Sequence, residues 1–355
     1  MNTLHIFYHF LKIVVILCEI VISEKIFMEV IYRRLCNICL VKLDTMLNIH
    51  NLYRKHAILD KIIFKLSKET EIYESIIFKM WLIKQKKEYV SNLNPIVIGG
   101  CPRSGTTLAR ALIGIHPEIA SPKKEYNILM WTRQKNVLQN VFDFTNAEIQ
   151  ELTNSYEDHI MFSEQVLRLF INKEGKSQIA LKHPFQILII DELFKYFPKM
   201  KFVHVIRDGR DASCSLRTHP KRKMVNGEIV PNFVKNPFDW CIRRWISCIN
   251  KGKKWRNSNN YIEIKYEDLV NNTIPTMQNV FSFLDLEMIP EDKLLSFYKT
   301  EKDDKHLQNI EVGMPIYKKT IGRWHNDMSP NEKDLFKRKA GNLLIELGYE
   351  KDKSW

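Results

Sequence analysis

From residue 95 onward, short apolar segments alternate with longer segments in which apolar residues recur every three or four positions. The first pattern is typical of buried strands and the second of amphipathic helices. Strands that alternate with helices imply right-handed βαβ units and a parallel sheet covered on both faces. We therefore expect a three-layer, P-loop-like α/β fold, whose strands lie at 96–100, 178–182, 201–207 and 261–266.

The segment before residue 95 has a different pattern. Up to about residue 90, apolar positions recur at helical spacing, glycine and proline are absent, and lysine is plentiful. The first break is "SNLNP" at 91–95, where turn-forming residues cluster. The sequence therefore predicts an N-terminal helical region, 1–94, followed by the main domain, 95–350.

The apolar stretch Leu4–Ile22 is long enough to cross a bilayer, but it is one-sided. At 100° per residue, His5, His9, Lys12 and Glu19 fall on one narrow stripe. No basic leader precedes it and no small-residue cleavage site follows, so a signal peptide is not expected. A membrane anchor, an interfacial helix and a helix packed on the protein body remain open, and the last two are slightly favoured.

Composition narrows the class of ligand. The chain of 355 residues has 45% hydrophobic and 27% charged residues, as globular proteins do, and a net charge of +13 that favours an anionic ligand or surface. Nucleic acid is not expected, because the one dense basic cluster, 219–223, is short and is predicted to be a solvated loop.

The cysteines bear on the cellular compartment. Seven cysteines without disulfide-like spacing favour a reducing environment, so we expect a cytoplasmic protein, with membrane association through residues 1–22 or a Golgi-type anchor as alternatives. Cys36 and Cys39 have zinc-like spacing but no second pair, and we interpret them as buried thiols.

The stretch "GGCPRSGTT" resembles a nucleotide-phosphate loop without its lysine. Gly100, Gly105 and Thr107 fit the pattern G-x-x-x-x-G-K-[ST], but Thr106 occupies the lysine position. Glycines let the backbone N–H groups turn inward, the helix expected from about Thr106 offers its positive end, and Ser104 adds a hydroxyl. The loop can therefore hold one anion.

The ends of the other predicted strands are basic. Lys182 and Arg207 stand where a nucleotide triphosphatase would place an acidic residue to help hold Mg²⁺. Ligands of parallel sheets bind beyond the carboxyl ends of the strands. We therefore expect these residues to meet the loop, and Tyr266 at the end of the last strand, around an anion that needs no metal.

Five ordered motifs, "PRSGTT" with a following "HP", "LKHP", "VIRDGRDASCSL", "KYEDL" and "KKTIGRW", resemble those of the sulfotransferases. The closest likeness is to the branch with tyrosylprotein sulfotransferases and many bacterial enzymes, and it covers residues 95 to about 348. The resemblance implies a co-substrate, 3′-phosphoadenosine 5′-phosphosulfate (PAPS), and no metal. It also implies an acceptor hydroxyl on a carbohydrate, lipid, small molecule or protein tyrosine.

The resemblance also implies residue roles. The phosphosulfate would lie on the loop residues Arg103 to Thr107, with Arg103 at the bridging oxygen. Arg207 and Ser215 would bind the 3′-phosphate, and Lys182 would neutralise the sulfuryl oxygens. The remaining contacts would come from Tyr266 at the adenosine, Arg323 and Lys319 on the 3′-phosphate side, and Trp324, which is either stacked on a ring or buried against the last helix.

The catalytic base is expected to be Glu125, in "SPKKEYN". Its register against the tyrosylprotein enzymes is uncertain by one residue, because Lys124 aligns with their glutamate without a gap. His183 is the weaker candidate, since the histidine-using branch has K-x-H where this chain has Pro184 third. We expect segments 121–175 and 218–236 to line the acceptor site.

Two other functions remain open. A kinase that uses ATP or GTP would need the same loop, but the missing lysine and the missing metal-holding acid count against it. A catalytically inactive, nucleotide-binding scaffold at a membrane would agree with the N-terminal helix. The oligomeric state cannot be predicted from the sequence.

Overall fold

The computed structural model describes residues 89–129, 133–156, 158–218, 221–225, 228–232, 235–301, 314–316 and 320–355. The predictions for the helical region 1–94 therefore lie outside the described residues except at its last positions, and those for Leu4–Ile22, Cys36, Cys39 and Lys319 lie wholly outside them. In the part that is described, no helix is long and apolar enough to span a bilayer.

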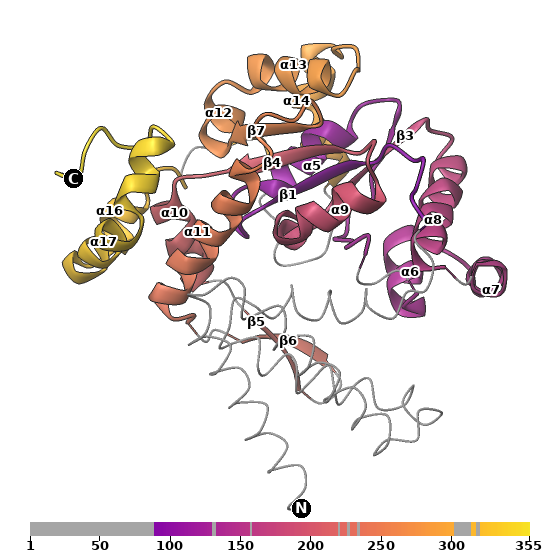
Figure 1. Ribbon diagram of the computed structural model, residues 1–355, viewed down its shortest axis with the longest axis horizontal. Coiled ribbons are helices and arrows are strands. Elements are labelled where there is room, and N and C mark those ends of the chain that lie inside the picture. Colours follow the sequence, from indigo (N-terminus) through magenta and orange to yellow (C-terminus); the bar gives the residue numbers. More distant parts are fainter. Residues whose placement is uncertain are drawn as a thin grey trace, which may run out of the picture. The chain divides into compact units, whose positions relative to one another are not determined.

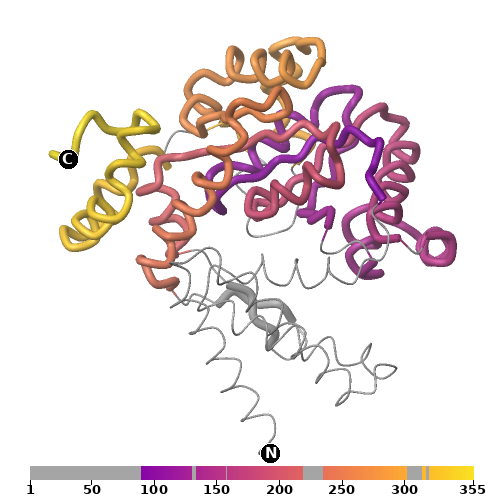
Figure 2. The backbone as a smooth tube through the Cα atoms, viewed as in Figure 1, coloured from indigo at the N-terminus to yellow at the C-terminus, as the bar shows by residue number. Residues whose placement is uncertain are grey.

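The centre of the fold is a parallel sheet with the strand order β2-β3-β1-β4-β7 (Figure 1). Figure 2 shows that the first described strand, in indigo, lies inside the sheet between later strands. The predicted α/β fold is confirmed. The strands are β1 Ile96–Gly100, β2 Ile119–Ala120, β3 Gln178–Lys182, β4 Lys201–Ile206 and β7 Tyr261–Lys265.

Helices connect the strands and extend the fold at its C-terminal end. The first half contains α5 Thr106–Gly114, α6 Lys135–Phe142, α7 Asn146–Ser155, α8 His159–Lys173, the 3₁₀ helix η2 Pro184–Ile189, α9 Ile190–Tyr196 and α10 Gly209–Arg217. The second half contains α11 Phe238–Lys253, α12 Tyr266–Asn271, α13 Thr273–Phe283, α14 Glu291–Leu295, α15 Phe297–Glu301, α16 Trp324–Asp327 and α17 Pro330–Glu346.

Successive side chains of the strands enter two different apolar layers. On β1, Ile96 and Ile98 pack into one buried cluster, whereas Val97 packs into the other. This alternation is the period of two that a strand imposes, and both faces are apolar because both are covered by helices. The helices α5, α13 and α14 line the first face, and η2, α9 and α11 line the second (Figure 1).

Two local predictions are wrong. The basic cluster at 219–223 was expected to be a loop, but residues 221–223 lie in β5 Lys221–Val225, which pairs antiparallel with β6 Glu228–Asn232. Tyr266 was expected to end a strand, but it begins α12. In both cases a short local pattern is compatible with more than one element, and pairing or packing with distant residues decides between them.

The aromatic helix α11 belongs to the core. Trp245 is fully buried, and Phe238 and Trp255 are partly buried against the same cluster. The four cysteines among the described residues, Cys101, Cys214, Cys241 and Cys248, are buried thiols without a disulfide.

Candidate active site

The loop after β1 turns sharply at two residues. Arg103 has a φ of 72° and Gly105 a φ of 92°, both in the left-handed region that residues other than glycine rarely adopt. A Cβ atom on Gly105 would lie 2.3 Å from Cδ2 of Tyr266. Only glycine therefore lets the loop pass this close to the Tyr266 ring as it enters α5.

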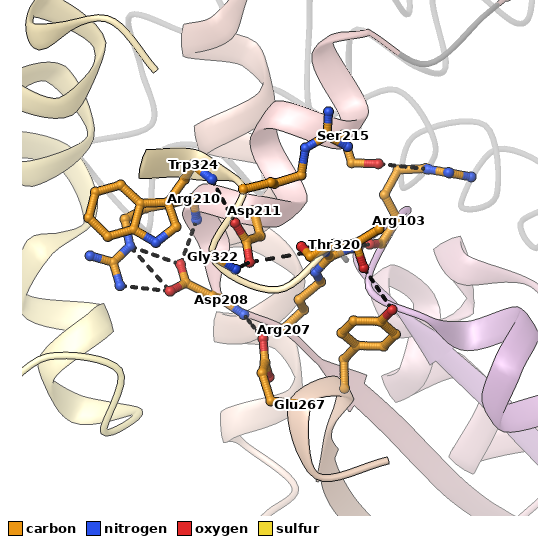
Figure 3. A network of polar contacts seen from close by, with 12 residues as sticks. Arg103, Arg207, Asp208, Arg210, Asp211, Ser215, Glu267, Thr320, Gly322 and Trp324 are labelled. Atoms are coloured by element: carbon orange, nitrogen blue, oxygen red, sulfur yellow. Dashed lines mark hydrogen bonds and ion pairs between the residues drawn. The ribbon is translucent and has the colours of Figure 1, made fainter. Parts of the chain in front are cut away.

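The loop is joined to β4 and α10 by arginine side chains (Figure 3). Nε of Arg103 donates a hydrogen bond of 3.1 Å to Oγ of Ser215, and Nη1 of Arg207 donates one of 3.0 Å to the Arg103 carbonyl. Arg207 follows β4 at its carboxyl end, and Ser215 lies on α10. The structure therefore brings together three residues that the sequence assigned to one ligand.

The guanidinium of Arg207 is buried and contacts several neighbouring groups. It stacks over the Tyr266 ring at 4.5 Å from the centroid, and its Nη2 donates to the carbonyl of Thr320. The Tyr266 hydroxyl is 2.9 Å from the Thr320 hydroxyl, and the Arg207 carbonyl accepts a hydrogen bond of 3.0 Å from the Trp245 indole. Arg207 is only 4% exposed, so its charge is held by dipoles and a ring face.

Two buried donors at this place have no hydrogen-bond partner among the described residues: the hydroxyl Oγ of Ser104, in the loop, and Nε of Arg207. Buried polar atoms are rarely left without partners, because their desolvation is then uncompensated. An anion held by the loop would accept from Ser104, and a second anionic group would accept from Arg207. The residues present therefore fit a phosphate or sulfate group.

Glu125 and Lys182 form the second part of the site. Lys182 ends β3, is buried, and its Nζ donates a hydrogen bond of 2.7 Å to Oε1 of Glu125. The Glu125 side chain is 45% exposed, so its carboxylate can be reached from solvent. Lys182 is paired with an acid, and that acid is the residue expected to be the base.

His183 lies next to this pair. Its Nε2 is 4.0 Å from Oε2 of Glu125. Burial lowers the pKa of His183 to about 4, against the opposing effect of the Glu125 carboxylate and with the help of the Lys182 charge. The imidazole is therefore neutral at neutral pH. Its backbone N–H bonds to the Ile98 carbonyl, which fixes it at the edge where β1 and β3 end.

The acidic residues after Arg207 serve the structure. Asp208 caps α10 by accepting from the Arg210 backbone N–H over 2.9 Å, and its carboxylate also binds the Arg210 guanidinium. Asp208 and Arg210 are thus partners of one another. The Asp211 carboxylate instead accepts from the backbone N–H groups of Gly322 and Trp324. Burial raises the pKa of Asp211, although these two N–H groups oppose the rise.

Arg323 and Trp324 contact other side chains of the protein, and the expected role of Arg323 at the ligand stays a prediction. Nε of Arg323 donates a hydrogen bond of 2.6 Å to Asp327 within the same short helical segment. The Trp324 ring is buried, lies edge-on to Trp355 and covers the Arg210 guanidinium at 3.9 Å. Of the two alternatives for Trp324, the structure has the buried one.

Sequence reasoning missed three residues that support the site: Thr320, Asp211 as a partner of the distant turn, and Glu267, which accepts from the Asp208 backbone N–H over 3.0 Å. Each acts on a residue at least 54 positions away. The only signals available were the motifs "VIRDGRDASCSL", "KYEDL" and "KKTIGRW", which contain these residues but do not indicate their contacts.

Two solved structures have a similar fold. The sulfotransferase domain of the olefin synthase from Synechococcus PCC 7002 matches with a TM-score of 0.54 and 19% identity, over 72% of this chain and 98% of that one. The sulfotransferase domain from the curacin biosynthetic pathway matches with a TM-score of 0.52 and 18% identity, over 71% and 98%. At this identity the likeness concerns the fold alone.

Relatives and a family model agree with one another. Protein-tyrosine sulfotransferase A from Caenorhabditis elegans is 26% identical over 72% of this chain and 67% of its own length, and the human protein-tyrosine sulfotransferase 1 is 25% identical over 74% and 71%. The model of the sulfotransferase family matches residues 95–290, which is more than half of the chain. The chain therefore belongs to the sulfotransferase family.

Proposed function

We propose that this sulfotransferase uses PAPS as its donor and binds it at the carboxyl ends of β1, β3 and β4. The observation that supports this most strongly is the contact between the loop and Arg207, where Nη1 of Arg207 reaches the Arg103 carbonyl and Arg103 reaches Ser215. ATP lacks a 3′-phosphate, so this second cationic position, apart from the loop, favours a donor with two separate anionic groups.

The loop would hold the 5′-phosphosulfate. Its donors would be backbone N–H groups at the start of α5, at Thr106 and Thr107, and the buried Ser104 hydroxyl that lacks a partner among the described residues. Arg103 would stabilise the charge that develops on the bridging oxygen as the S–O bond breaks. Arg207 and Ser215 would bind the 3′-phosphate, with Tyr266 nearby on the adenosine side.

Glu125 would accept the proton of the acceptor hydroxyl. In the proposed step the acceptor oxygen attacks sulfur, the bond from sulfur to the bridging oxygen breaks, and adenosine 3′,5′-bisphosphate leaves. Lys182 donates a hydrogen bond of 2.7 Å to Oε1 of Glu125, which orients the carboxylate that would take the proton. The same lysine carries the charge that the sulfuryl oxygens need, so positioning and electrostatics supply most of the rate.

The acceptor is a hydroxyl, and we propose that it belongs to a protein tyrosine. The names of the relatives support this class over a carbohydrate, lipid or small molecule. The exposed position of the Glu125 carboxylate agrees with an acceptor as large as a polypeptide. Whether residues 1–22 bring the protein to a membrane remains an expectation from the sequence.

The function is tested by incubating the full chain with ³⁵S-labelled PAPS and three acceptor sets: tyrosine peptides, the same peptides with phenylalanine, and a lipid and glycan extract. We expect label in the tyrosine peptides alone, and equally in the presence of EDTA. Label in the extract alone would agree with a sulfotransferase activity but would reject tyrosine as its acceptor. Abolition by EDTA, or transfer from γ-labelled ATP instead, would favour the kinase.

A further inference from the structure

Residues Thr320 to Trp324 form a turn, the 320–324 turn, that lies beside α10 although more than a hundred residues separate them (Figure 3). Gly322, at its centre, has a φ of 75°, so the turn relies on glycine. The Thr320 end of the turn contacts the Arg207 guanidinium and the Tyr266 hydroxyl, and therefore forms part of the surroundings of the proposed nucleotide site.

Two residues that are four positions apart, Arg207 and Asp211, hold the 320–324 turn in place. At one point Nη2 of Arg207 donates to the Thr320 carbonyl. At the other, the two oxygens of Asp211 accept from Gly322 over 2.7 Å and from Trp324 over 3.0 Å. Asp211 is only 1% exposed, and its carboxylate lies 3.9 Å from the Arg207 guanidinium. The two residues thus act on the same short segment from the same side.

Helix capping does not explain the position of Asp211 in α10. The cap of this helix is Asp208, whose carboxylate also binds Arg210. The Asp211 carboxylate instead presents one oxygen to each of two backbone donors, an arrangement that only a carboxylate can offer without leaving a donor unpaired. A buried N–H that lost this acceptor would carry its full desolvation cost.

We propose that Asp211 is a positioning residue that holds the 320–324 turn against Arg207 and so keeps the guanidinium aimed at the 3′-phosphate of the donor. The inference deepens the proposed function and rests on it. Without the turn, Nη2 of Arg207 loses its carbonyl partner, and the guanidinium keeps the Arg103 carbonyl, the Tyr266 ring and the longer contact with Asp211. The 5′ end, held by the loop, does not depend on Asp211.

The test compares adenosine 3′,5′-bisphosphate with adenosine 5′-monophosphate, which lacks the 3′-phosphate, by calorimetric titration of the full chain. The variant Asp211→Asn keeps the shape but replaces one acceptor oxygen by an NH₂ group, which faces a backbone donor. The matched control is Asp191→Asn on α9, whose carboxylate accepts from the Trp255 indole over 2.9 Å and from Lys251 over 3.1 Å, outside the site.

We expect Asp211→Asn to weaken the bisphosphate about tenfold, equivalent to about 1.4 kcal/mol, and the monophosphate less than about twofold. Asp191→Asn should leave the ratio of the two affinities unchanged even if it lowers the melting temperature. Equal losses for both nucleotides, or no loss for either, would leave the ratio of the two affinities unchanged. This result would show that Asp211 is merely structural and would overturn the inference.

A second variant covers the case in which Asp211→Asn does not fold. Gly322→Ala keeps Asp211 but strains the turn at its positive φ, and its Cβ would meet only Cδ2 of His325 at 3.7 Å. Like Asp211→Asn, it should weaken the bisphosphate more than the monophosphate. An unchanged ratio of the two affinities would contradict the inference. A wild-type chain that binds both nucleotides equally would instead reject the proposed donor, so the two failures are distinguishable.

Discussion

The ammonium group of Lys182 donates a hydrogen bond of 2.7 Å to the carboxylate of Glu125. The two residues come from different parts of the chain: Lys182 ends β3, and Glu125 lies in the connection after β2. The Tyr126 backbone N–H also bonds to the Lys182 carbonyl, which fixes the connection to the strand. The proposed base is thus held at the same edge of the sheet as the phosphate loop.

Replacing the proposed base should separate catalysis from binding. We expect Glu125→Gln to lower kcat by about 10²–10⁴-fold, because general base catalysis contributes this much, while the affinity for adenosine 3′,5′-bisphosphate stays nearly the same. Glu118→Gln is the matched control, since Glu118 is exposed and its carboxylate contacts Ser177. Full activity in Glu125→Gln would remove Glu125 from the mechanism and return His183 to consideration.

The close approach of Gly105 to Tyr266 should make Gly105→Ala costly. Gly175 provides the control, because its φ of 62° is also positive but nothing lies within 4 Å of an added Cβ. We expect Gly105→Ala to lower the free energy of unfolding by about 1–3 kcal/mol more than Gly175→Ala does, since only the first adds a clash. Denaturant titration of both variants measures the difference, and equal losses would mean that the loop moves aside freely.

The pKa of His183 gives a prediction on pH. Its value in the folded protein is about 4, below the usual 6.5, so the unfolded chain binds a proton more readily between these values. The contribution of His183 to stability is therefore complete above about pH 6.5 and is lost as the pH falls toward 4, by at most about 1.4 kcal/mol per pH unit.

Nuclear magnetic resonance of labelled histidines can follow this titration directly. The His183 signals, assigned with His183→Gln, should titrate near pH 4, and the variant should show a flatter fall in unfolding free energy between pH 6.5 and 4 than the wild type. The exposed His325, replaced by glutamine, serves as the control. Titration of His183 near pH 6.5 would contradict the burial on which this prediction rests.

A buried ion pair joins the helix behind the loop to α15. Nη1 of Arg110 donates a hydrogen bond of 2.8 Å to Glu301, and the two side chains are 2% and 6% exposed. Removing one partner leaves a buried charge, so Glu301→Ala should lower the free energy of unfolding by about 3–5 kcal/mol, whereas the double change Arg110→Met with Glu301→Leu should restore most of it.

Chemical denaturation measures the free energy of unfolding of the wild type, Glu301→Ala and the double variant. As a control, Lys201→Met breaks the pair with the exposed Asp285 and should change the free energy of unfolding by less than about 1 kcal/mol. If Glu301→Ala were as mild as the control, the pair would have to be solvated in solution.

The alternating pattern predicted most of the sheet and the residues at its edge. The strands β1, β3 and β4 follow apolar runs that can be recognised without their neighbours, so the positions of Arg103, Lys182 and Arg207 follow from counting. The strand β2 has two residues, Ile119–Ala120, and is defined only by its pairing with β3. No periodicity can reveal a strand of that length.

Contacts between distant segments could not be predicted. Arg110 and Glu301 are 191 residues apart, and neither lies in a recognisable motif. A local pattern would suggest that Asp211 pairs with its neighbours or caps the helix, but its hydrogen-bond donors are backbone N–H groups of a late turn.

The central claim is that Arg207, together with the loop, recognises a nucleotide with two separate anionic groups and needs no divalent ion. The most direct measurement is calorimetric titration of the wild type and Arg207→Ala with adenosine 3′,5′-bisphosphate and adenosine 5′-monophosphate, in the presence of EDTA. We predict that the wild type binds the bisphosphate more tightly and that Arg207→Ala loses this preference while its affinity for the monophosphate changes little. Equal losses for both nucleotides, or wild-type binding that requires Mg²⁺, would contradict the claim.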